Sequence, residues 1–433
     1  MILEFKIENF LSFRKEQVLS FEPSSSKDYE SQYCAEVKDG VKVLKLGLLY
    51  GANASGKTNL LKALEFLRKF ILVQKKDKTE STGIIKFQFD NDYYSKPSKF
   101  YLSFYLNQIK YVYTVVLDEK KVIEENLIYY PGIQPAIFFE RKYDEIKEKS
   151  TIKFGGTIDL KLSDKKLIEG LTILNSSVLS AFGKANVEKS LFDDVFNWFK
   201  ENFMQMIQPT TDLFGWTSSK VEKDDLCKDF VLEVLQKADF NISAIDIDEK
   251  EIPIDEDLES KISSMDMPEN LKEKILQKKM LKAKDISFQH KTILMEKNLP
   301  RKLESNGTIR YYGLGGVLNR LMSSNTFLCV DEIENSLHYD LVAHFIKTFL
   351  MNSTNSQLLF STHDINLLNE DFLRRDTVWF VDKNEFGASE LASLLDFKLH
   401  KNLSPYNAYK IGKLGAKPEL GDIILNQHGK KKC

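Results

Sequence analysis

The stretch Gly51-Ala-Asn-Ala-Ser-Gly-Lys-Thr58 matches the pattern G-x-x-x-x-G-K-S/T, and its setting decides the fold. The short apolar run 45–50 precedes it, and in residues 58–73 after it leucine and isoleucine recur at helical spacing. A glycine-bearing loop between a strand and a helix lets successive backbone N–H groups curl around a phosphate. The plain alternative, a glycine turn with an incidental lysine, would not require this setting. The stretch therefore predicts a nucleotide-binding P-loop.

The polar residues of this loop have expected roles in holding ATP and Mg²⁺, the two expected cofactors. Lys57 is expected to reach the β- and γ-phosphates, and the Thr58 hydroxyl is expected to ligate Mg²⁺. The residues of the loop that are expected to contact the nucleotide are Gly51, Asn53, Ser55, Gly56, Lys57, Thr58 and Asn59.

A second apolar run, 326–330, ends in two adjacent carboxylates, Asp331 and Glu332. Ligands of parallel sheets bind at the carboxyl ends of the strands, so these side chains are expected beside the P-loop. Asp331 is expected to hold Mg²⁺ through water, and Glu332 to orient or deprotonate the attacking water. A strand ending in Asp-Glu is weak evidence alone, but it becomes strong when a P-loop is present.

A third apolar run, 357–361, is followed by Thr362 and His363. A lone histidine is usually structural. Here the strand end is expected beside that of Asp331, near the γ-phosphate, which favours a contact role for His363.

The turn Ser305-Asn-Gly307 opens a further amphipathic helix. A Ser-x-Gly turn at a helix N-terminus presents N–H donors and a hydroxyl to an anion. Taken alone, however, the turn favours the simpler interpretation, a serine N-cap.

Length and composition limit the class of protein. At 433 residues the chain predicts two or three structural units, and a formal net charge of −2 provides no global field toward nucleic acid. The four cysteines have neither metal-ligand nor disulfide-framework spacing, and Cys329 within an apolar run is expected to be a small buried hydrophobe. Without a signal peptide or a bilayer-length apolar run, we expect a soluble cytoplasmic protein that does not associate with membranes.

The pattern along the chain indicates an α/β nucleotide-binding domain in two sequence halves. Residues 1–162 are expected to hold the P-loop and, from Ile84 to about Phe139, an antiparallel meander. Residues 163–284 are rich in helix formers, including 191–207 and 270–284, and predict a helical insertion with the acidic stretch 246–260 as a loop. The lysine-rich run 272–284 favours a solvated helix face over nucleic-acid binding. Residues 285–433 form the second half.

Taken together, the motifs resemble those of ABC-type ATPases, whose fold is a mixed sheet with an antiparallel β meander. Ser305-Asn-Gly307 stands where that family has its signature, Asn335-Ser-Leu-His338 is similar to its D-loop, and His363 to its switch histidine. The resemblance implies composite ATP sites shared between two subunits of a homodimer or larger homo-oligomer. Gln88 is the candidate for the Q-loop. The opening Ile7-Glu-Asn-Phe-Leu-Ser-Phe13 is similar to the RecF and SMC-like branch.

Over nearly the whole chain the sequence resembles the AAA/ABC ATPases of bacterial anti-phage and abortive-infection operons, relatives of the ATPase half of OLD nucleases and of the PARIS ATPase subunit. The matching stretches are Phe138-Phe-Glu-Arg141, Glu304-Ser-x-Gly-Thr-x-Arg310, Val330-Asp-Glu-Ile-Glu334, Ser336-Leu-His338, Ser361-Thr-His-Asp364 and Tyr409-x-x-Gly-x-Leu-Gly-Ala416-x-Pro418. Unlike OLD proteins, the sequence shows no acidic cluster resembling a Toprim nuclease after His363. The resemblance therefore implies a separate, nuclease-like effector from the same operon.

Three functions remain open from the sequence. The first is a defence ATPase that senses infection and regulates an effector, with DNA or a phage component as a further partner. The second is a DNA-repair ATPase of the RecF/SMC type that binds DNA. The third, the motor subunit of an ABC transporter, is disfavoured by the long insertion between the P-loop and Ser305 and by the Asn-Phe strand at the start of the chain.

Overall fold

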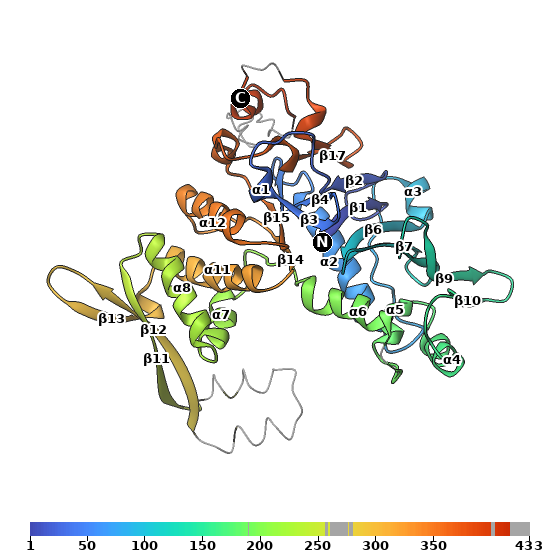
Figure 1. The fold of residues 1–433 in the computed structure, drawn as a ribbon, viewed down its shortest axis with the longest axis horizontal. Coiled ribbons are helices and arrows are strands. Elements are labelled where there is room, and N and C mark those ends of the chain that lie inside the picture. The colour runs from blue at the N-terminus through green and yellow to red at the C-terminus, as the bar shows by residue number, and fades with distance from the viewer. Residues whose placement is uncertain (189, 256–258, 260–275, 277–279, 400–402, 416–433) are drawn as a thin grey trace, which may run out of the picture. The chain divides into compact units, whose positions relative to one another are not determined.

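The computed structural model describes residues 1–433 except 189, 256–258, 260–275, 277–279, 400–402 and 416–433 (Figure 1). The chain divides into two compact units. Unit 1 comprises Met1–Pro209, Leu321–Asn335 and Ile346–Cys433, and unit 2 comprises Thr210–Arg320 and Ser336–Phe345.

A largely parallel sheet in unit 1 has the strand order β14-β15-β5-β16-β17. Its strands are β14 (Phe327–Val330), β15 (Gln357–Ser361), β5 (Leu46–Tyr50), β16 (Val378–Lys383) and β17 (Ser389–Ser393). The first four run parallel, and β17 turns back antiparallel to β16. Every residue of β5, β14 and β15 is buried, as expected for strands covered on both faces. The apolar runs around β5, β14 and β15 were therefore correctly predicted as strands.

Lys45 stabilises the start of β5. It is buried, and its Nζ donates to the carbonyl oxygens of Leu350 (2.9 Å) and Ser353 (2.7 Å) near the end of α12 (Tyr339–Asn352). The negative end of a helix favours a cation at this place. Burial nevertheless lowers the pKa of Lys45 to about 8.

A second sheet of unit 1 is antiparallel, with the order β10-β9-β8-β7-β6-β1-β2. Its strands are β1 (Ile2–Glu8), β2 (Gln17–Ser20), β6 (Ser98–Leu106), β7 (Ile109–Leu117), β8 (Val122–Tyr130), β9 (Ala136–Asp144) and β10 (Lys149–Phe154). Buried residues alternate with partly exposed ones along β7 and most of β8. The expected meander is confirmed, and Figure 1 labels β6, β7, β9 and β10 in the teal part of the chain. Residues 84–97, which were expected to begin it, lie outside the sheet.

Helix α2 (Lys57–Leu72) follows the P-loop and joins it to the antiparallel sheet. Leu60, Leu64 and Leu67 are fully buried, which confirms the amphipathic helix predicted after the loop. Phe66 of α2 stacks on Phe100 of β6 with ring centroids 5.2 Å apart. The helix that carries Lys57 is therefore held by aromatic packing as well as by its own hydrogen bonds.

A buried ion pair fastens residues 173–178 to this antiparallel sheet. Arg141 of β9 and Glu125 of β8 are fully buried, with Nη1 and Oε2 3.4 Å apart. The guanidinium also donates to three carbonyl oxygens of residues 173–176, and both Glu125 oxygens accept the Val178 N–H. The Tyr113 hydroxyl donates to the same carboxylate. Such dense hydrogen bonding is what a charge pair requires in a dry core.

The segment 191–207 is only partly helical. Helix α6 (Leu191–Asn197) continues as the π-helix η1 (Trp198–Asn202), and the chain then becomes extended. Phe203 and Ile207 form parallel bridges with Phe327 and Val330 of β14. The helical expectation is thus wrong for residues 203–207, because the open edge of β14 offers hydrogen bonds that continued helix would not use.

The insertion expected over 163–284 is helical only in its first part. Unit 2 holds α7 (Leu213–Val221) and α8 (Asp225–Lys237), followed by an antiparallel sheet of β11 (Ile242–Pro253), β12 (Met280–Lys291) and β13 (Glu296–Pro300) (Figure 1). The loop expected from Asp246 is wrong as far as Pro253, and the helix expected over 270–284 is wrong for 280–284. The rest of both stretches, and of the lysine-rich run 272–284, lies outside the described residues, apart from isolated positions.

The reason for this error lies in the pairing of the two strands. The register places Ile245 opposite Phe288 and Ile247 opposite Ile286. Apolar residues at paired positions favour an antiparallel ladder, and neither segment shows this pairing by itself.

The remaining elements connect these layers. They are α1 (Glu30–Tyr33), β3 (Cys34–Lys38), β4 (Val41–Leu44), α3 (Asn91–Ser95), α4 (Leu162–Leu171), α5 (Val178–Phe182), the 3₁₀ turns η2 (Arg301–Leu303), η3 (Ile365–Asn369), η4 (Arg375–Thr377) and η5 (Leu394–Asp396), and the helices α11 (Asn306–Ser323) and α13 (Pro405–Lys410). In the described part of the chain, no helix is both long and apolar enough to cross a bilayer.

Candidate functional site

A pocket of about 460 Å³ lies in unit 1 over the P-loop. It collects residues that follow β5, β14 and β15 together with the last residue of β16, and these strands all reach the same edge of the parallel sheet. Its lining residues are Asn53, Ala54, Ser55, Gly56, Lys57, Thr58, Asn59, Glu332, His363 and Lys383.

Both glycines of the loop are required by close neighbours. A Cβ on Gly51 would lie 2.3 Å from the Val381 carbonyl oxygen, and one on Gly56 would lie 2.2 Å from the Ser389 hydroxyl. Gly56 also has φ +117°, a conformation that L side chains rarely adopt. The loop is therefore packed from beneath by the β16–β17 hairpin.

Lys57 is held inside its own loop. Its Nζ donates to the carbonyl oxygens of Gly51 (2.7 Å) and Ala52 (3.1 Å) and lies 3.4 Å from His363 Nδ1. Burial lowers the pKa of Lys57, and the nearby carboxylates of Asp331, Glu334 and Glu332 oppose this shift. The present partners of the ammonium are therefore uncharged carbonyl oxygens. A phosphate, which carries negative charge, can replace them.

Asp331 lies beside Thr58, the other residue that is predicted to hold Mg²⁺. Its Oδ1 accepts hydrogen bonds from Thr58 Oγ1 (3.1 Å) and Ser361 Oγ (2.6 Å), and the residue is buried. The Thr58 hydroxyl and the Asp331 carboxylate are oxygen ligands of the kind that Mg²⁺ prefers, and they are already in contact. Water and phosphate oxygens would complete the coordination of the ion. The residues present therefore fit the ion that the motif implies.

Glu332 and His363 face each other at the mouth of the pocket. Glu332 Oε1 lies 3.6 Å from His363 Nε2, and the side chains are 45% and 37% exposed. A neutral His363 ring with its proton on Nε2 satisfies this approach and the one from Lys57 at Nδ1. Glu332 also has φ +48°, in the left-handed region that is unusual for a residue with a side chain.

The turns after β14 and β15 are joined by hydrogen bonds. The Glu332 N–H donates to Ser361 Oγ (2.8 Å), the Ile333 N–H to the Ser361 carbonyl oxygen (3.2 Å), and the His363 N–H to Glu334 Oε1 (2.5 Å). The carboxylate and the histidine are thus positioned by one connected network rather than by separate loops.

The structure brings together most of the residues that the sequence selected. Asp331 is connected to the pocket by its hydrogen bond with Thr58. The predicted residues that line the pocket are Asn53, Ser55, Gly56, Lys57, Thr58, Asn59, Glu332 and His363. Gly51 lies at the base of the loop. Gln88 is exposed, donates to the carbonyl oxygen of Lys86 in its own segment, and is not among the lining residues.

Ser305 and Gly307 belong to unit 2 and are also not among the residues that line this pocket. Ser305 Oγ accepts the Thr308 N–H at 3.0 Å, so it forms the N-cap that the sequence alone favoured. Ser305 and Asn306 are exposed, and Ser336 of the predicted D-loop lies against Gly307, whose Cβ would be 3.2 Å from the Ser336 carbonyl oxygen.

Sequence reasoning missed three residues around the P-loop. Lys383 lines the pocket from the end of β16. The Ser389 hydroxyl donates to the Ser55 carbonyl oxygen (2.5 Å) and lies 2.7 Å from Ser12 Oγ, which accepts from Asn59 (2.8 Å). The apolar run 378–381 ahead of Lys383 was a usable signal, because it marks another parallel strand. The serines carry no such signal.

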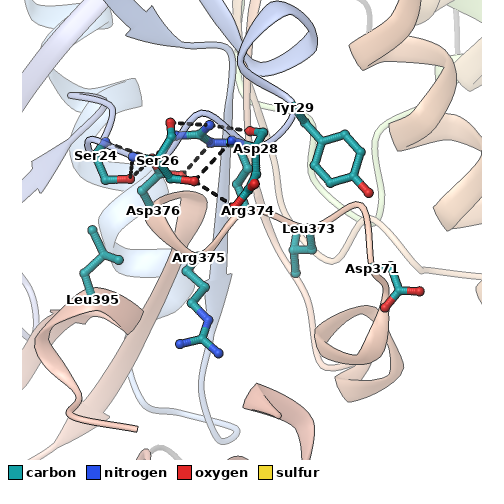
Figure 2. A pocket seen from close by; sticks show the side chains of 10 residues that line it. All are labelled: Ser24, Ser26, Asp28, Tyr29, Asp371, Leu373, Arg374, Arg375, Asp376 and Leu395. Atoms are coloured by element: carbon teal, nitrogen blue, oxygen red, sulfur yellow. Dashed lines mark hydrogen bonds and ion pairs between the residues drawn. The ribbon is translucent and has the colours of Figure 1, made fainter. Parts of the chain in front are cut away.

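A second pocket in unit 1, of about 430 Å³, is lined by residues of the loop 24–29, residues 371–376 and Leu395 (Figure 2). Arg374 forms a buried pair with Asp376 and also donates to the carbonyl oxygens of Ser26 and Asp28. Asp376 in turn accepts from the Ser24 N–H and hydroxyl. The charged groups of Arg374 and Asp376 in this pocket thus bind the loop 24–29 to the start of η4.

These features define the class of protein. Three buried parallel strands are followed by the P-loop, by an Asp-Glu pair and by a histidine, respectively, and an antiparallel sheet accompanies them. This combination defines an ABC-type P-loop domain of mixed α/β fold. A family model described as "AAA domain, putative AbiEii toxin, Type IV TA system" matches residues 48–369. The chain belongs to this family, which confirms the resemblance to abortive-infection ATPases and implies a nucleotide-binding P-loop.

No curated protein matches the chain. Similar solved structures include the SMC head domain from Thermotoga maritima, with 12% identity, a TM-score of 0.41 and coverage of 90% of this chain and 98% of that one. Another is an Smc head domain with an extended coiled coil bound to the C-terminal domain of ScpA, from Pyrococcus furiosus, with 13% identity, a TM-score of 0.37 and coverage of 95% and 98%.

We predict that Lys57→Ala weakens ATP binding by about 100-fold or more, because a charge-assisted contact to phosphate is lost. Calorimetric titration with ATP and Mg²⁺ measures this. Lys62→Ala, which removes an exposed lysine of the same helix, is the matched control and should bind normally. Wild-type affinity in Lys57→Ala would contradict the P-loop assignment.

Proposed function

We propose that this chain binds ATP·Mg²⁺ in the P-loop pocket and hydrolyses it. The single observation that carries the proposal is the meeting of Lys57, Thr58, Asp331, Glu332 and His363 in one network at one sheet edge. Ion-pair networks also occur for purely structural reasons, but a structural network would not need a 460 Å³ pocket over the P-loop.

Each residue has a role in this mechanism. The N–H groups of the loop and Lys57 bind the β- and γ-phosphates, while Thr58 and Asp331 hold Mg²⁺. The bound ion supplies neutralisation of phosphate charge. Glu332 accepts a proton from the attacking water, and His363 contacts the γ-phosphate beside it. Lys57 leaves the carbonyl oxygens of Gly51 and Ala52 when phosphate arrives.

Glu332→Gln is expected to retain ATP but to slow its hydrolysis by about 100-fold or more, since the amide keeps the shape and loses the base. Single-turnover hydrolysis and nucleotide retention measure the two effects separately. Glu385→Gln, at an exposed carboxylate outside the lining residues, is the control. Hydrolysis at the wild-type rate in Glu332→Gln would assign the base to another residue.

We further propose that Ser305 and Gly307 complete the ATP site of a neighbouring subunit in a homodimer. Glu332 and His363 are partly exposed, so the γ-phosphate side of the pocket is open to water. The helix that begins at Asn306 presents an exposed N-terminus, whose N–H groups and positive dipole suit a phosphate. A second copy supplying this end would exclude solvent and strengthen the electrostatics at the reacting group.

Mixing two inactive variants tests the shared site. Lys57→Ala and Ser305→Arg should each be inactive, but their heterodimer keeps one intact site. After full subunit exchange we expect about a quarter of the wild-type rate, because half of the dimers are mixed and each holds one working site of two. No recovery despite demonstrated exchange, or full activity of Ser305→Arg alone, would exclude the shared site.

Finally, we propose that the ATPase regulates a separate effector in anti-phage defence. The family description names a toxin of a toxin–antitoxin system, which supports a role in abortive infection over a housekeeping one. ATP-driven association of two subunits is a means by which such a protein could hold or release an effector.

Affinity purification of the Glu332→Gln chain from its native host, compared with Lys57→Ala, tests this role. We expect a nuclease-like protein encoded nearby to be retained by the ATP-bound variant alone. DNA-stimulated ATPase activity without such a protein would favour the DNA-repair alternative. Metal-dependent DNA cleavage by the purified chain, lost on mutating one of its own carboxylates, would also refute the proposal.

A further inference from the structure

The hydroxyl of Ser361 occupies the centre of the hydrogen-bond network behind the pocket. Ser361 is the last residue of β15 and is fully buried. Its Oγ donates to Asp331 Oδ1 at 2.6 Å and accepts the Glu332 N–H at 2.8 Å. One hydroxyl thus contacts both the expected metal ligand and the backbone of the expected base.

The contact to Glu332 fixes an unfavourable backbone conformation. Glu332 has φ +48°, a region that residues with a side chain avoid unless their surroundings impose it. Its N–H has Ser361 Oγ as acceptor, and the next N–H, of Ile333, donates to the Ser361 carbonyl oxygen at 3.2 Å. Without the hydroxyl the Glu332 peptide can relax, and the direction of its carboxylate then changes.

The contact to Asp331 bears on the metal. Asp331 Oδ1 also accepts from Thr58, the residue expected to turn its oxygen toward Mg²⁺. Ser361 is not one of the expected ligands, so its donation to Asp331 need not be given up when the ion binds. Hydrogen bonds of this kind orient metal-binding carboxylates, and their loss typically weakens metal affinity or activity about 10–100-fold.

We propose that Ser361 is a positioning residue for ATP hydrolysis, holding Asp331 toward the metal and Glu332 toward the attacking water through one hydroxyl. The inference rests on the proposed function. It extends that function to a residue that is not among those lining the pocket and that would therefore not contact the substrate.

The same strand provides a matched control at its other end. Ser356 stands directly before β15 and is also fully buried. Its Oγ accepts the Thr326 N–H at 3.0 Å and donates to the Ser324 carbonyl oxygen at 2.5 Å. Ser356 and Ser361 therefore both bridge β15 to the segment of β14, each with one donated and one accepted bond, but only Ser361 lies beside the P-loop.

The test compares Ser361→Ala with Ser356→Ala in the full chain. Both should lower Tm by a similar few degrees, because each leaves a backbone N–H without its acceptor. Only Ser361→Ala should lower kcat, by about tenfold or more. In the presence of a non-hydrolysable ATP analogue, Mn²⁺ affinity followed by electron paramagnetic resonance should fall about five- to tenfold in Ser361→Ala alone.

Ser361→Cys provides a graded variant that carries the test if the alanine variant does not fold. A thiol is larger than a hydroxyl and is a weak donor and a weak acceptor, so kcat and Mn²⁺ affinity should lie between those of wild type and Ser361→Ala. Unchanged kcat and Mn²⁺ affinity in the Ser361 variants, or equal losses in Ser356→Ala, would overturn the inference. A wild-type chain that does not hydrolyse ATP would instead defeat the proposed function, and the Mn²⁺ measurement would still report on Ser361.

Discussion

The pairing of β5 with β15 is the constraint on which the site depends. Leu46–Leu49 lie in parallel register with Leu358–Ser361, and the ladder is extended by bonds from Leu358 to Lys45 and from Thr362 to Leu49. Because of this register, the P-loop and His363 both follow the ends of neighbouring strands at the same edge of the sheet. More than 300 positions of sequence separate them. A shift by one residue would turn every side chain of β15 to the opposite face, so the contact of Ser361 with Asp331 would be lost.

The antiparallel sheet supports this arrangement indirectly. Helix α2 leaves the P-loop and packs through Phe66 on Phe100, so the direction of the helix that carries Lys57 and Thr58 depends on a second layer. The buried pair of Glu125 and Arg141 keeps residues 173–178 against that layer. A buried charge pair of this kind is weak evidence for stability, but it gives its segment a single allowed position.

Sequence reasoning reached the fold and the grouping of the candidate site's residues, because both depend on strong local signals. The P-loop pattern, the run before Asp331 and the run before His363 each combine an apolar strand with the polar residue that follows it. The β11–β12 pair was missed, because its apolar pairs, such as Ile245 with Phe288, join two separate segments and only the register brings them together. Ser389 and Ser12 were missed for a related reason. Their importance comes from the space under Gly56, which no short pattern encodes.

The position of β5 inside its sheet limits how the chain can be divided. The segment recognised as the family, 48–369, begins within β5 and ends before β16, yet β5 is hydrogen-bonded to β16 over residues 48–50. It also omits β1, which pairs with β6, as well as Lys383 and Ser389. An isolated 48–369 fragment would expose two unpaired strand edges and the underside of the P-loop, so it would be prone to aggregate. The segment by which the family is recognised is therefore shorter than the part of the chain that is needed to complete these two sheets.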